Sequence, residues 1–588
     1  MNILDQLKRE ISDSLKELYQ AEDQSLKFEN TNPNFEGDIT FVVFPLLRIS
    51  KKGPEQTAQE IGESLIGTSA MIDSFNVVKG FLNLVFKQEI WLDYLKEHVE
   101  SGVVIPRLAN KGEKVAVEYS SPNTNKPLHL GHIRNNVLGF SMSQILDANG
   151  FDVIKTNIVN DRGVHICKSM LAWQKFANGE TPESSGLKGD HFVGKYYVKF
   201  DQAFKEEQAK LIEGGMSAEE AEQSSNLMQE VRKMLKDWEE GEKEVVALWK
   251  KMNAWVYSGF DISYKTLGVS FDHIYYESET YLRGKESVLK GVEDGIFYQK
   301  EDGSIWVDLT DEGLDQKLLL RSDGTSVYMT QDIGTASMRF EDHKMDRSIY
   351  VVGNEQDYHF KVLQLVCKKL GYSFWEGIYH LSYGMVDLPS GKMKSREGTV
   401  VDADDLMSQM VSTARKQTEE LGKTEGMDEK ELGELYHMLG LGAIKYFLLK
   451  VDAKTRMLFD PQESIDFQGN TGPFIQYTHT RILSILRAAG DTSLALTPEL
   501  NSDERKLIHL LYDYPSVVND AARTYNPSLI ANAAYELAKY YNKFYHQHSI
   551  LGADNQDVRS FRILLSKQVG LALKHAFGLL GIDMPERM

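Results

Sequence analysis

The chain has 588 residues, of which 42% are hydrophobic and 26% are charged, so it can form about three or four globular domains, and a disordered or fibrous protein is excluded. Its 66 basic and 86 acidic residues give a formal net charge of −20, which argues against non-specific coating of nucleic acid but not against a local basic patch. The two cysteines, Cys167 and Cys367, form no CxxC pair, which excludes a zinc ribbon and a disulfide scaffold.

Charges near the start of the chain argue against targeting to a membrane. Asp5, Lys8, Arg9 and Glu10 lie where a signal peptide needs an apolar core. No stretch of about 18 apolar residues is free of charge, so no membrane span is predicted. We therefore expect a cytoplasmic protein with no membrane partner.

The first 108 residues are predicted to form a small α+β unit. Apolar residues from Ile3 to Leu18 recur at spacings of one to four, which predicts an amphipathic helix. A helix over 56–65 and a strand pair over 75–86, with Lys79-Gly80 at its turn, complete the unit. Residues 106–112 are predicted to be the linker that leaves it.

A parallel sheet is predicted to start near Lys114. A short buried strand over 115–120, a helix over 128–150 and a second strand over 151–160 make a βαβ unit, which strands at 348–353 and 378–386 extend. Residues 201–250 contain 7 basic and 13 acidic residues and are interpreted as a solvated helical insertion. From about Asp404 onward the pattern is helical almost to the end.

A histidine motif lies at the junction of the first strand and its helix. His129 and His132 are three residues apart, so they share one face of the first helical turn, whose N–H groups and dipole favour phosphate. Gly131 has no side chain and would let a flat base approach. Taken alone, the two histidines are also compatible with helix capping or with half of a metal site, although no third ligand is nearby.

A basic loop follows the last predicted strand of the sheet. Residues 391–399 read GKMKSREGT, which places Lys392 and Lys394 between two glycines where they can meet an anion. Most basic loops are only solvated. The order of this loop and the histidine motif along one parallel sheet makes a phosphate-binding role the favoured interpretation.

These two elements resemble the HIGH and KMSKS motifs of the class I aminoacyl-tRNA synthetases. Further stretches are similar to the arginyl-tRNA synthetase family over nearly the whole chain: SSPNTNKPLHLGHIRN, YMTQDIG, VVGNEQDYHF, YGMV, TGPFIQYTHTRI and GIDMPERM. The resemblance implies an α/β Rossmann-type core with a parallel sheet, an N-terminal α+β domain and a C-terminal α-helical anticodon-binding domain. The implied divisions are 1–108 (an additional tRNA-binding domain), 109–402 (catalytic, with a helical insertion at about 170–300), 403–460 (a helical connection) and 461–588 (anticodon-binding).

The family reaction joins arginine to tRNA in two steps, through arginyl-adenylate made from ATP. The resemblance implies ATP with Mg²⁺ as the substrate complex and no zinc. It implies catalytic roles for Lys126, His129, His132 and Lys392, and ATP contacts by Pro127, His129, Gly131, His132, Met385, Val386, Lys392, Lys394 and Ser395. Ser395 departs from the family motif, which has a second lysine there, and Lys126, just before the histidines, is expected to compensate.

The resemblance also implies residues for arginine and for tRNA. The arginine-binding set is Glu118, Ser121, Asn123, His129, Tyr328, Asp332 and Gln356, and carboxylates suit the five fixed donors of a guanidinium. The tRNA-binding set is Phe81, Asn83, Tyr477, Arg481, Tyr541 and Tyr545, since aromatic and basic side chains can stack on bases and meet phosphates. The partners are then tRNA(Arg), arginine and ATP, and a monomer is expected.

Three other functions fit the sequence less well. A class I synthetase for another amino acid, such as cysteine, is disfavoured because zinc-ligand cysteines are missing while Glu118 and Asp332 are present. A small-molecule nucleotidyltransferase with an HxGH motif would not need about 130 further helical residues at the carboxyl end. A tRNA-binding paralogue with a dead site is disfavoured because Lys126, His129, His132 and Lys392 are all intact.

Overall fold

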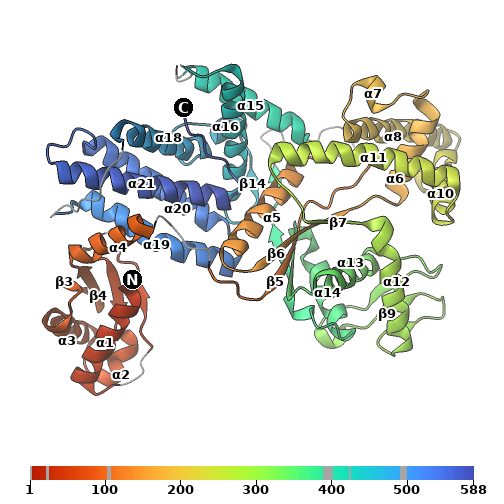
Figure 1. Cartoon of the computed structure of the whole chain (residues 1–588). Helices are drawn as coiled ribbons and strands as arrows, with labels where there is room; N and C mark the ends of the chain where they lie inside the picture. The colour runs from red at the N-terminus through yellow and green to blue at the C-terminus, as the bar shows by residue number, and fades with distance from the viewer. Residues whose placement is uncertain are drawn as a thin grey trace.

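The computed structural model describes residues 3–21, 25–32, 34–101, 108–387, 401–420, 422, 426–490 and 499–588. Figure 1 shows an elongated molecule with a parallel sheet near its middle. The N-terminal unit and the C-terminal helices lie at one end, and a set of inserted helices lies at the other.

The N-terminal unit is a four-stranded antiparallel sheet in the order β1-β2-β4-β3, with helices packed on it. The amphipathic helix is confirmed, because α1 buries Ile3, Leu7, Ile11 and Leu15. The predicted hairpin is confirmed too, with Lys79 (φ 51°) and Gly80 (φ 83°) in the left-handed conformation that a tight hairpin turn needs. The elements are α1 (Ile3–Tyr19), β1 (Phe28–Glu29), β2 (Ile39–Val42), η1 (Phe44–Leu46), α2 (Leu47–Ser50), α3 (Pro54–Thr68), β3 (Ile72–Val78), β4 (Phe81–Phe86) and α4 (Gln88–Ser101).

The central sheet has five parallel strands in the order β12-β11-β5-β6-β7. The first crossover helix, α5 (Leu130–Ala148), joins the neighbouring strands β5 and β6. Because the chain next builds outward to β7 and later returns to β11 on the other side of β5, the order reverses beside β5, where open sheets bind ligands. The strands are β5 (Lys114–Glu118), β6 (Asp152–Val159), β7 (His273–Tyr276), β11 (Arg347–Gly353) and β12 (Ile378–Tyr383).

The predicted insertion at about 170–300 differs from the one observed. A helical group over 164–267 separates β6 from β7, and the sequence patterns did not reveal β7 as a sheet strand. A second insertion then adds a three-stranded antiparallel sheet, β10-β9-β8, before the chain reaches β11. The elements are α6 (Val164–Phe176), α7 (Pro182–Ser185), α8 (Gly189–Glu213), α9 (Ala218–Ser224), α10 (Asn226–Glu239), α11 (Lys243–Leu267), α12 (Glu277–Glu293), β8 (Tyr298–Gln299), β9 (Ile305–Val307), η2 (Thr310–Glu312), β10 (Lys317–Leu320) and α13 (Tyr328–His343).

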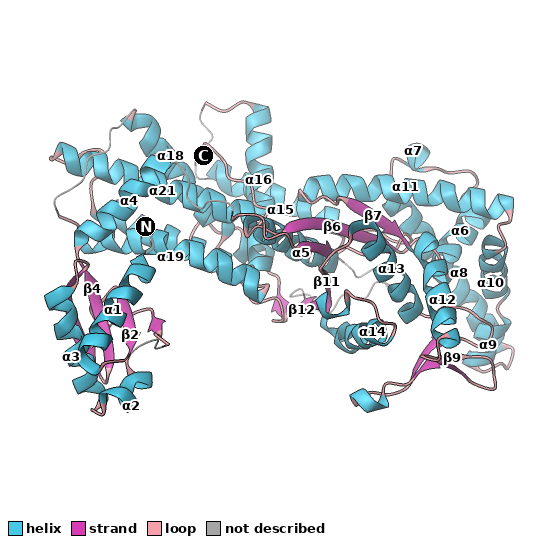
Figure 2. Ribbon diagram, turned by 60° about the horizontal axis from the view of Figure 1, so that its bottom comes forward, coloured by secondary structure: helices cyan, strands magenta, loops and turns pink. Residues whose placement is uncertain are grey.

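The last part of the described chain is helical, as predicted (Figure 2). The strand predicted over 378–386 ends at Tyr383, and after Gly384 the chain forms β13, which pairs with β14 in a separate small sheet. The remaining elements are η3 (Asn354–Gln356), α14 (Asp357–Lys369), η4 (Trp375–Gly377), β13 (Val386–Asp387), α15 (Ala403–Glu420), α16 (Glu429–Leu449), β14 (Met457–Leu458), α17 (Pro461–Ser464), α18 (Gly472–Ala489), α19 (Ser502–Thr524), α20 (Ser528–Gln547) and α21 (Gln556–Leu579).

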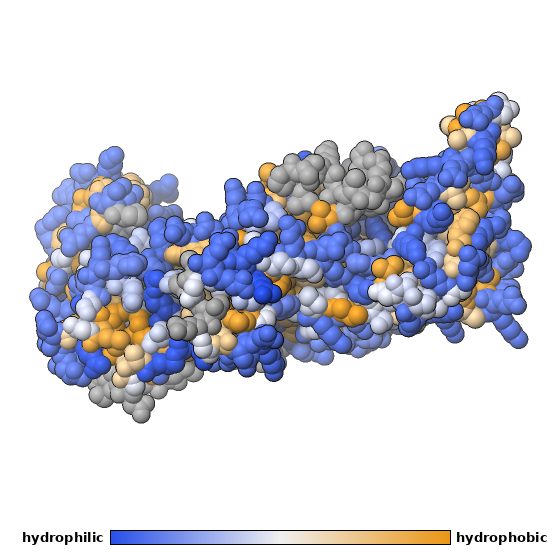
Figure 3. Space-filling model, turned by 90° about the horizontal axis from the view of Figure 1, so that it is seen from above, coloured by the Kyte–Doolittle hydropathy of each residue, from blue (hydrophilic) through white to orange (hydrophobic). Residues whose placement is uncertain are grey.

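The carboxyl end of the chain packs back onto the helices. Gln476 donates to the carbonyl of Asp583 at 2.8 Å, and Ser141 of α5 donates to the carbonyl of Leu579 at 2.9 Å. The first bond lies within the C-terminal region, and the second ties α5, the first helix of the parallel sheet, to it. The outer surface is mostly hydrophilic in the view of Figure 3, with apolar side chains in separate patches, and none of the described helices is long and apolar enough to cross a membrane.

Candidate active site

The histidine motif caps the helix that leaves the first sheet strand. His129 immediately precedes α5, and its Nδ1 accepts a hydrogen bond from the backbone N–H of Gly131 at 3.1 Å. The Nδ1 of His132 accepts from the backbone N–H of His129 at 3.1 Å, and the two ring centroids lie 3.9 Å apart. The two histidines therefore cap the helix, which was one of the interpretations left open by the sequence, and their imidazoles lie side by side at the sheet edge.

These capping bonds decide which ring nitrogen carries the proton. Because Nδ1 is an acceptor in both rings, the neutral imidazoles carry their hydrogen on Nε2. Burial, followed by the charge of Lys126, lowers the pKa of His129 to about 4. Burial, then His129 and Lys126, lower the pKa of His132 well below its usual value. At neutral pH the motif thus offers two uncharged N–H donors at the positive end of α5, an arrangement suited to phosphate oxygens.

A segment from much later in the chain supports the motif. The N–H of Leu130 donates to the carbonyl of Val401 at 3.2 Å, and the N–H of Ala403 donates to the carbonyl of Leu128 at 3.0 Å. This antiparallel pairing places residues 401–403 beside His129.

The predicted ATP contacts of the basic loop precede this segment in the sequence. Lys392, Lys394 and Ser395 lie outside the described residues.

Arg134 ties α5 to the predicted adenine contact at Met385 and Val386. Its fully buried guanidinium donates to the carbonyl of Gly384 at 2.7 Å and to that of Met385 at 3.4 Å. It also donates to two carbonyls within 453–455, each at 2.9 Å. Met385 is 48% exposed and Val386 is buried, so the backbone next to the motif is fixed while one side chain faces outward.

Lys126 and Pro127 lie in the loop between β5 and α5. A Cβ added to Gly194 of α8 would lie 2.9 Å from Cδ of Pro127, so this loop and the inserted helix are in close contact. The positive charge of Lys126 contributes to the lowered pKa values of both His129 and His132. A cation therefore lies near the two N–H donors, where the expected compensation for Ser395 requires one.

Glu118 is buried at the end of β5 and forms an ion pair with Arg339 of α13. The Arg339 side chain is 0% exposed, and its guanidinium carbon lies 5.4 Å and 5.3 Å from the ring centroids of Tyr275 and Tyr350. Burial raises the pKa of Glu118, and the attraction of Arg339 opposes that shift. The carboxylate predicted to bind arginine thus already has a guanidinium partner from within the protein.

Asp332, the second predicted carboxylate, lies in α13 and is more open. Its Oδ2 is 2.5 Å from Nε2 of His359, which is on α14, and its side chain is 36% exposed. Its negative charge contributes to the raised pKa of Glu118, so the two carboxylates are electrostatic neighbours. Asp332 is therefore the more accessible of the two for a bound guanidinium.

The other predicted arginine contacts lie on the same edge of the sheet. Ser121, with φ 46°, and the exposed Asn123 follow β5, while the exposed Gln356 follows β11. Tyr328 begins α13 one helical turn before Asp332 and is 78% exposed. The edge therefore combines a deep carboxylate with polar and aromatic groups that remain open.

Two acidic residues on this edge were missed from the sequence. Asp161, after β6, accepts hydrogen bonds from the N–H and hydroxyl of Ser278 at 2.9 and 2.8 Å and from the hydroxyl of Tyr257 at 2.9 Å. Glu277, after β7, accepts from Gln331 at 2.7 Å, and burial raises its pKa to about 7. An acidic residue directly after a strand was the available signal: it was present for Asp161 after the predicted strand over 151–160, whereas the strand before Glu277, β7, was not predicted.

Three of the predicted tRNA contacts come together on the C-terminal helices. The guanidinium carbon of Arg481 lies 4.9 Å from the ring centroid of Tyr477 and 4.7 Å from that of Tyr545, and the three line a surface hollow of about 540 Å³. Tyr541 is 0% exposed among core side chains. The prediction that Tyr541 contacts a base is therefore wrong, because helical aromatics of this kind form the core.

The two predicted tRNA contacts of the N-terminal unit differ from each other. Phe81 is partly exposed and packs against Phe44, with ring centroids 5.3 Å apart. Asn83 is 2% exposed, accepts from the Thr40 hydroxyl at 2.6 Å and donates to Asn76 at 2.8 Å. The prediction for Asn83 is wrong, because its amide is already bonded inside the sheet.

Family models match the chain in three consecutive stretches. The class I (R) tRNA synthetase catalytic domain matches residues 97–460. The DALR anticodon-binding domain matches residues 475–588, and the arginyl-tRNA synthetase N-terminal domain matches residues 5–86.

Curated relatives and solved structures match over the full length. Proteins named arginine–tRNA ligase are 56% identical in Bacteroides thetaiotaomicron and 52% identical in Flavobacterium psychrophilum, each match covering 100% of both chains. The arginyl-tRNA synthetase of Thermus thermophilus superposes with a TM-score of 0.81 at 25% identity, again over 100% of both chains. That of Plasmodium falciparum has a TM-score of 0.74 at 19% identity, covers 100% of this chain and 99% of its own, and shows the shared fold alone.

Proposed function

The chain belongs to the arginyl-tRNA synthetase family of class I tRNA synthetases, and on that premise we propose how its site performs the family's reaction. The protein is an arginine–tRNA ligase. It joins arginine to ATP, which gives arginyl-adenylate and pyrophosphate, and then transfers the arginyl group to the 3′ end of tRNA. Because the chemistry is an in-line displacement at the α-phosphate, the protein's task is to position the reactants and stabilise charge.

The observation that carries the assignment of the phosphate site is the pair of neutral imidazoles at the start of α5. Their Nε2–H groups and the dipole of α5 meet the phosphate oxygens of ATP, which arrives with Mg²⁺ as part of the substrate. Lys126 supplies a permanent charge beside them, and Lys392 supplies a second one from its loop. As the bond to pyrophosphate breaks, these groups stabilise the charge that develops on the leaving oxygens.

Arginine lies, in this proposal, at the carboxyl edge of the sheet beside the adenylate. Asp332 accepts from the guanidinium, and the exposed ring of Tyr328 covers the substrate's aliphatic stem. Gln356 adds an acceptor from the neighbouring strand end. Glu118 acts together with Arg339 as a buried ion pair that fixes the floor of the pocket. Ser121 and Asn123 line the loop through which arginine meets the α-phosphate.

For tRNA we propose two contacts far apart on the molecule. The hollow formed by Tyr477, Arg481 and Tyr545 stacks unpaired anticodon bases, since guanidinium and phenol planes both accept a base face. Phe81, at the hairpin of the N-terminal unit, meets the body of the tRNA. The functional division then follows the predicted one, with residues 1–108 and 461–588 on tRNA, 109–402 on the two small substrates and 403–460 as the connection. The enzyme acts as a monomer in the cytoplasm.

Amino-acid-dependent exchange of pyrophosphate into ATP, with and without tRNA, tests the proposal. Exchange should depend on arginine and should not occur with cysteine or lysine. Lys126→Ala should lower the exchange rate by about 10²–10³-fold, the usual effect of removing one stabiliser of transition-state charge. Lys290→Ala, a matched change of an exposed lysine on α12, should leave it unaltered.

Two results would overturn parts of this proposal. Exchange supported by another amino acid and not by arginine would overturn the substrate assignment. A Lys126→Ala enzyme with the parental rate would remove Lys126 from the phosphate site and leave the serine at 395 without compensation.

A further inference from the structure

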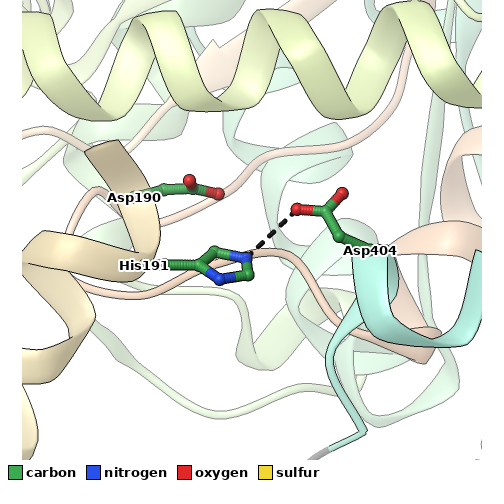
Figure 4. Close-up of side chains that lie close together, drawn as sticks. All are labelled: Asp190, His191 and Asp404. Atoms are coloured by element: carbon green, nitrogen blue, oxygen red, sulfur yellow. Dashed lines mark hydrogen bonds and ion pairs between the residues drawn. The ribbon is translucent and has the colours of Figure 1, made fainter. Parts of the chain in front are cut away.

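A network of charged side chains joins the inserted helices to the start of α15 (Figure 4). Lys188, just before α8, donates to the hydroxyl of Ser263 on α11 at 2.6 Å, lies 3.2 Å from Oδ2 of Asp190, and bonds to Asp404. His191 of α8 has its Nε2 3.1 Å from Asp404. The network therefore links three helices, α8, α11 and α15, that are far apart in sequence.

Asp190, His191 and Asp404 lie close enough together to suggest a cation site. However, the ammonium of Lys188 forms ion pairs with Asp190 and with Asp404, so both carboxylates already have a cationic partner. Asp190 is 0% exposed, and a Cβ on Gly259 would lie 2.3 Å from its Oδ1, so the space beside this carboxylate is filled. We therefore interpret the group as an ion-pair network and not as a metal centre.

This network reaches the histidine motif through a single short segment. Asp402 is 3.2 Å from Nε2 of His191 and is also the residue that pairs with His129 across the antiparallel bridge. The neighbouring residues on both sides, Val401 and Ala403, make the backbone hydrogen bonds to 128–130 described above. The charged side chains of 402 and 404 thus point to the insertion, while the backbone between them holds the motif.

We propose that Lys188 and His191 are positioning residues for activation: they hold residues 401–404 against the inserted helices and thereby fix the backbone that places His129. The proposal rests on the phosphate-binding role assigned to the histidine pair. Neither side chain contacts a substrate. The inserted helices then serve as a rigid support for the chemistry of the first step.

The first experiment replaces Lys188 with Met, which has a similar length but no charge. Lys188→Met should lower the exchange rate constant by about 10-fold to 10²-fold, because a misplacement on the order of 1 Å has that effect on an in-line reaction. The KM for arginine should change by less than about threefold, since the arginine contacts lie on other elements. Lys188→Arg should recover most of the rate. Lys195→Met, which breaks an exposed ion pair between Lys195 of α8 and Glu180, is the matched control and should behave like the parent.

Hydrogen exchange gives a readout that does not depend on activity. The amides of Leu130 and Ala403 should lose protection in Lys188→Met by more than about tenfold, while the core of α20 keeps its protection. Equal loss of protection throughout the chain, without recovery in Lys188→Arg, would show a merely structural role and overturn the proposal. Unchanged protection and rate in Lys188→Met would overturn it as well. If protection falls locally but the rate does not, the network positions the segment while the phosphate-site assignment is the part that fails.

The ionisation of His191 provides a second test of the proposal. The hydrogen bond to Asp404 and the charges of Asp402 and Asp190 raise the pKa of His191, while burial and Lys188 oppose the shift. A protonated His191 forms ion pairs with Asp402 and Asp404. The Leu130 amide should therefore lose protection against hydrogen exchange as the pH rises above about 6.5 through the raised pKa of His191. His191→Asn should abolish this pH dependence. Persistence of the same dependence in His191→Asn would overturn the role of this side chain.

Discussion

The histidine motif and the proposed arginine pocket lie on the same edge of one sheet but are held in place in different ways. The rings of His129 and His132 are fixed by hydrogen bonds to backbone N–H groups two and three residues away. The carboxylates of Glu118 and Asp332 depend instead on side chains from other elements, the guanidinium of Arg339 and the imidazole of His359. The ring orientations of the histidines therefore follow from a local turn, although residues 401–403 also hold its backbone, whereas the pocket exists only when distant parts of the fold are assembled.

The largest predicted effect is a loss of stability when Glu118 is replaced. Glu118→Ala leaves a guanidinium that is 0% exposed without its partner, and breaking one side of a buried pair destabilises a protein by about 3–5 kcal/mol. Urea unfolding should show this loss. Adding Arg339→Met should recover a large part of it, because the buried charge is then removed. A single variant as stable as the parent would show that the pair is not a structural element.

A substitution in the histidine motif should lower the rate of the reaction without lowering the stability of the fold. His132→Ala removes one N–H donor from the phosphate site, and the exchange rate constant should fall by about 10²–10³-fold. The melting temperature should change little, because the lost capping bond is worth only about 1 kcal/mol. A variant that melts far below the parent would contradict the view that the motif is locally held.

Asp332 should show the opposite pattern to the histidines. Asp332→Asn removes the charge that faces arginine, and the KM for arginine should rise by about 10–100-fold, with a smaller change in the rate at saturation. His359→Gln, which keeps a donor toward Asp332, should give a much smaller rise. Equal effects of Asp332→Asn on the rate and on the KM would place this carboxylate in the chemistry and not in recognition.

The smallest predicted effect is a pH dependence of stability at Glu277. Burial raises the pKa of this carboxyl from 4.5 to about 7, so the folded state holds its proton more tightly than the unfolded state. Its contribution to stability is therefore fully present below pH 4.5 and is lost as the pH rises to about 7. Glu277→Gln should melt at a higher temperature than the parent at pH 8 and at the same temperature near pH 4.5. Parallel melting curves at all pH values would contradict a raised pKa.

Elements that repeat a local pattern could be predicted from the sequence. The period of α1, the hairpin at Lys79-Gly80 and the alternation of strand and helix around α5 all depend on neighbouring residues. The four-residue strand β7 has no such pattern, because HIYY alternates neither in hydropathy nor in charge. Gly384 ended the last strand because its backbone approaches residues 454–456, a contact that no local rule reveals.

The same distinction applies to the candidate site. The position of His129 and His132 followed from their spacing, and their edge of the sheet followed from the βαβ order. The partner of Glu118 is 221 residues away and that of Asp332 is 27 residues away on another helix, so neither pair could be inferred from a motif. Tyr541 and Asn83 were misassigned for a related reason: burial depends on which helix or strand covers a side chain, and the sequence of one element does not say that.

The central claim is that the pocket selects its amino acid by positive charge, read by Asp332 with Glu118 behind it. The most direct test compares kcat/KM for arginine and for citrulline in aminoacylation of tRNA by the parent enzyme. Citrulline has a similar length but no charge, so it cannot give Asp332 the charge-assisted hydrogen bonds of a guanidinium, and a preference for arginine of about 10⁴ is expected. If citrulline is used as well as arginine, the pocket does not read charge and the assignment of the two carboxylates is wrong.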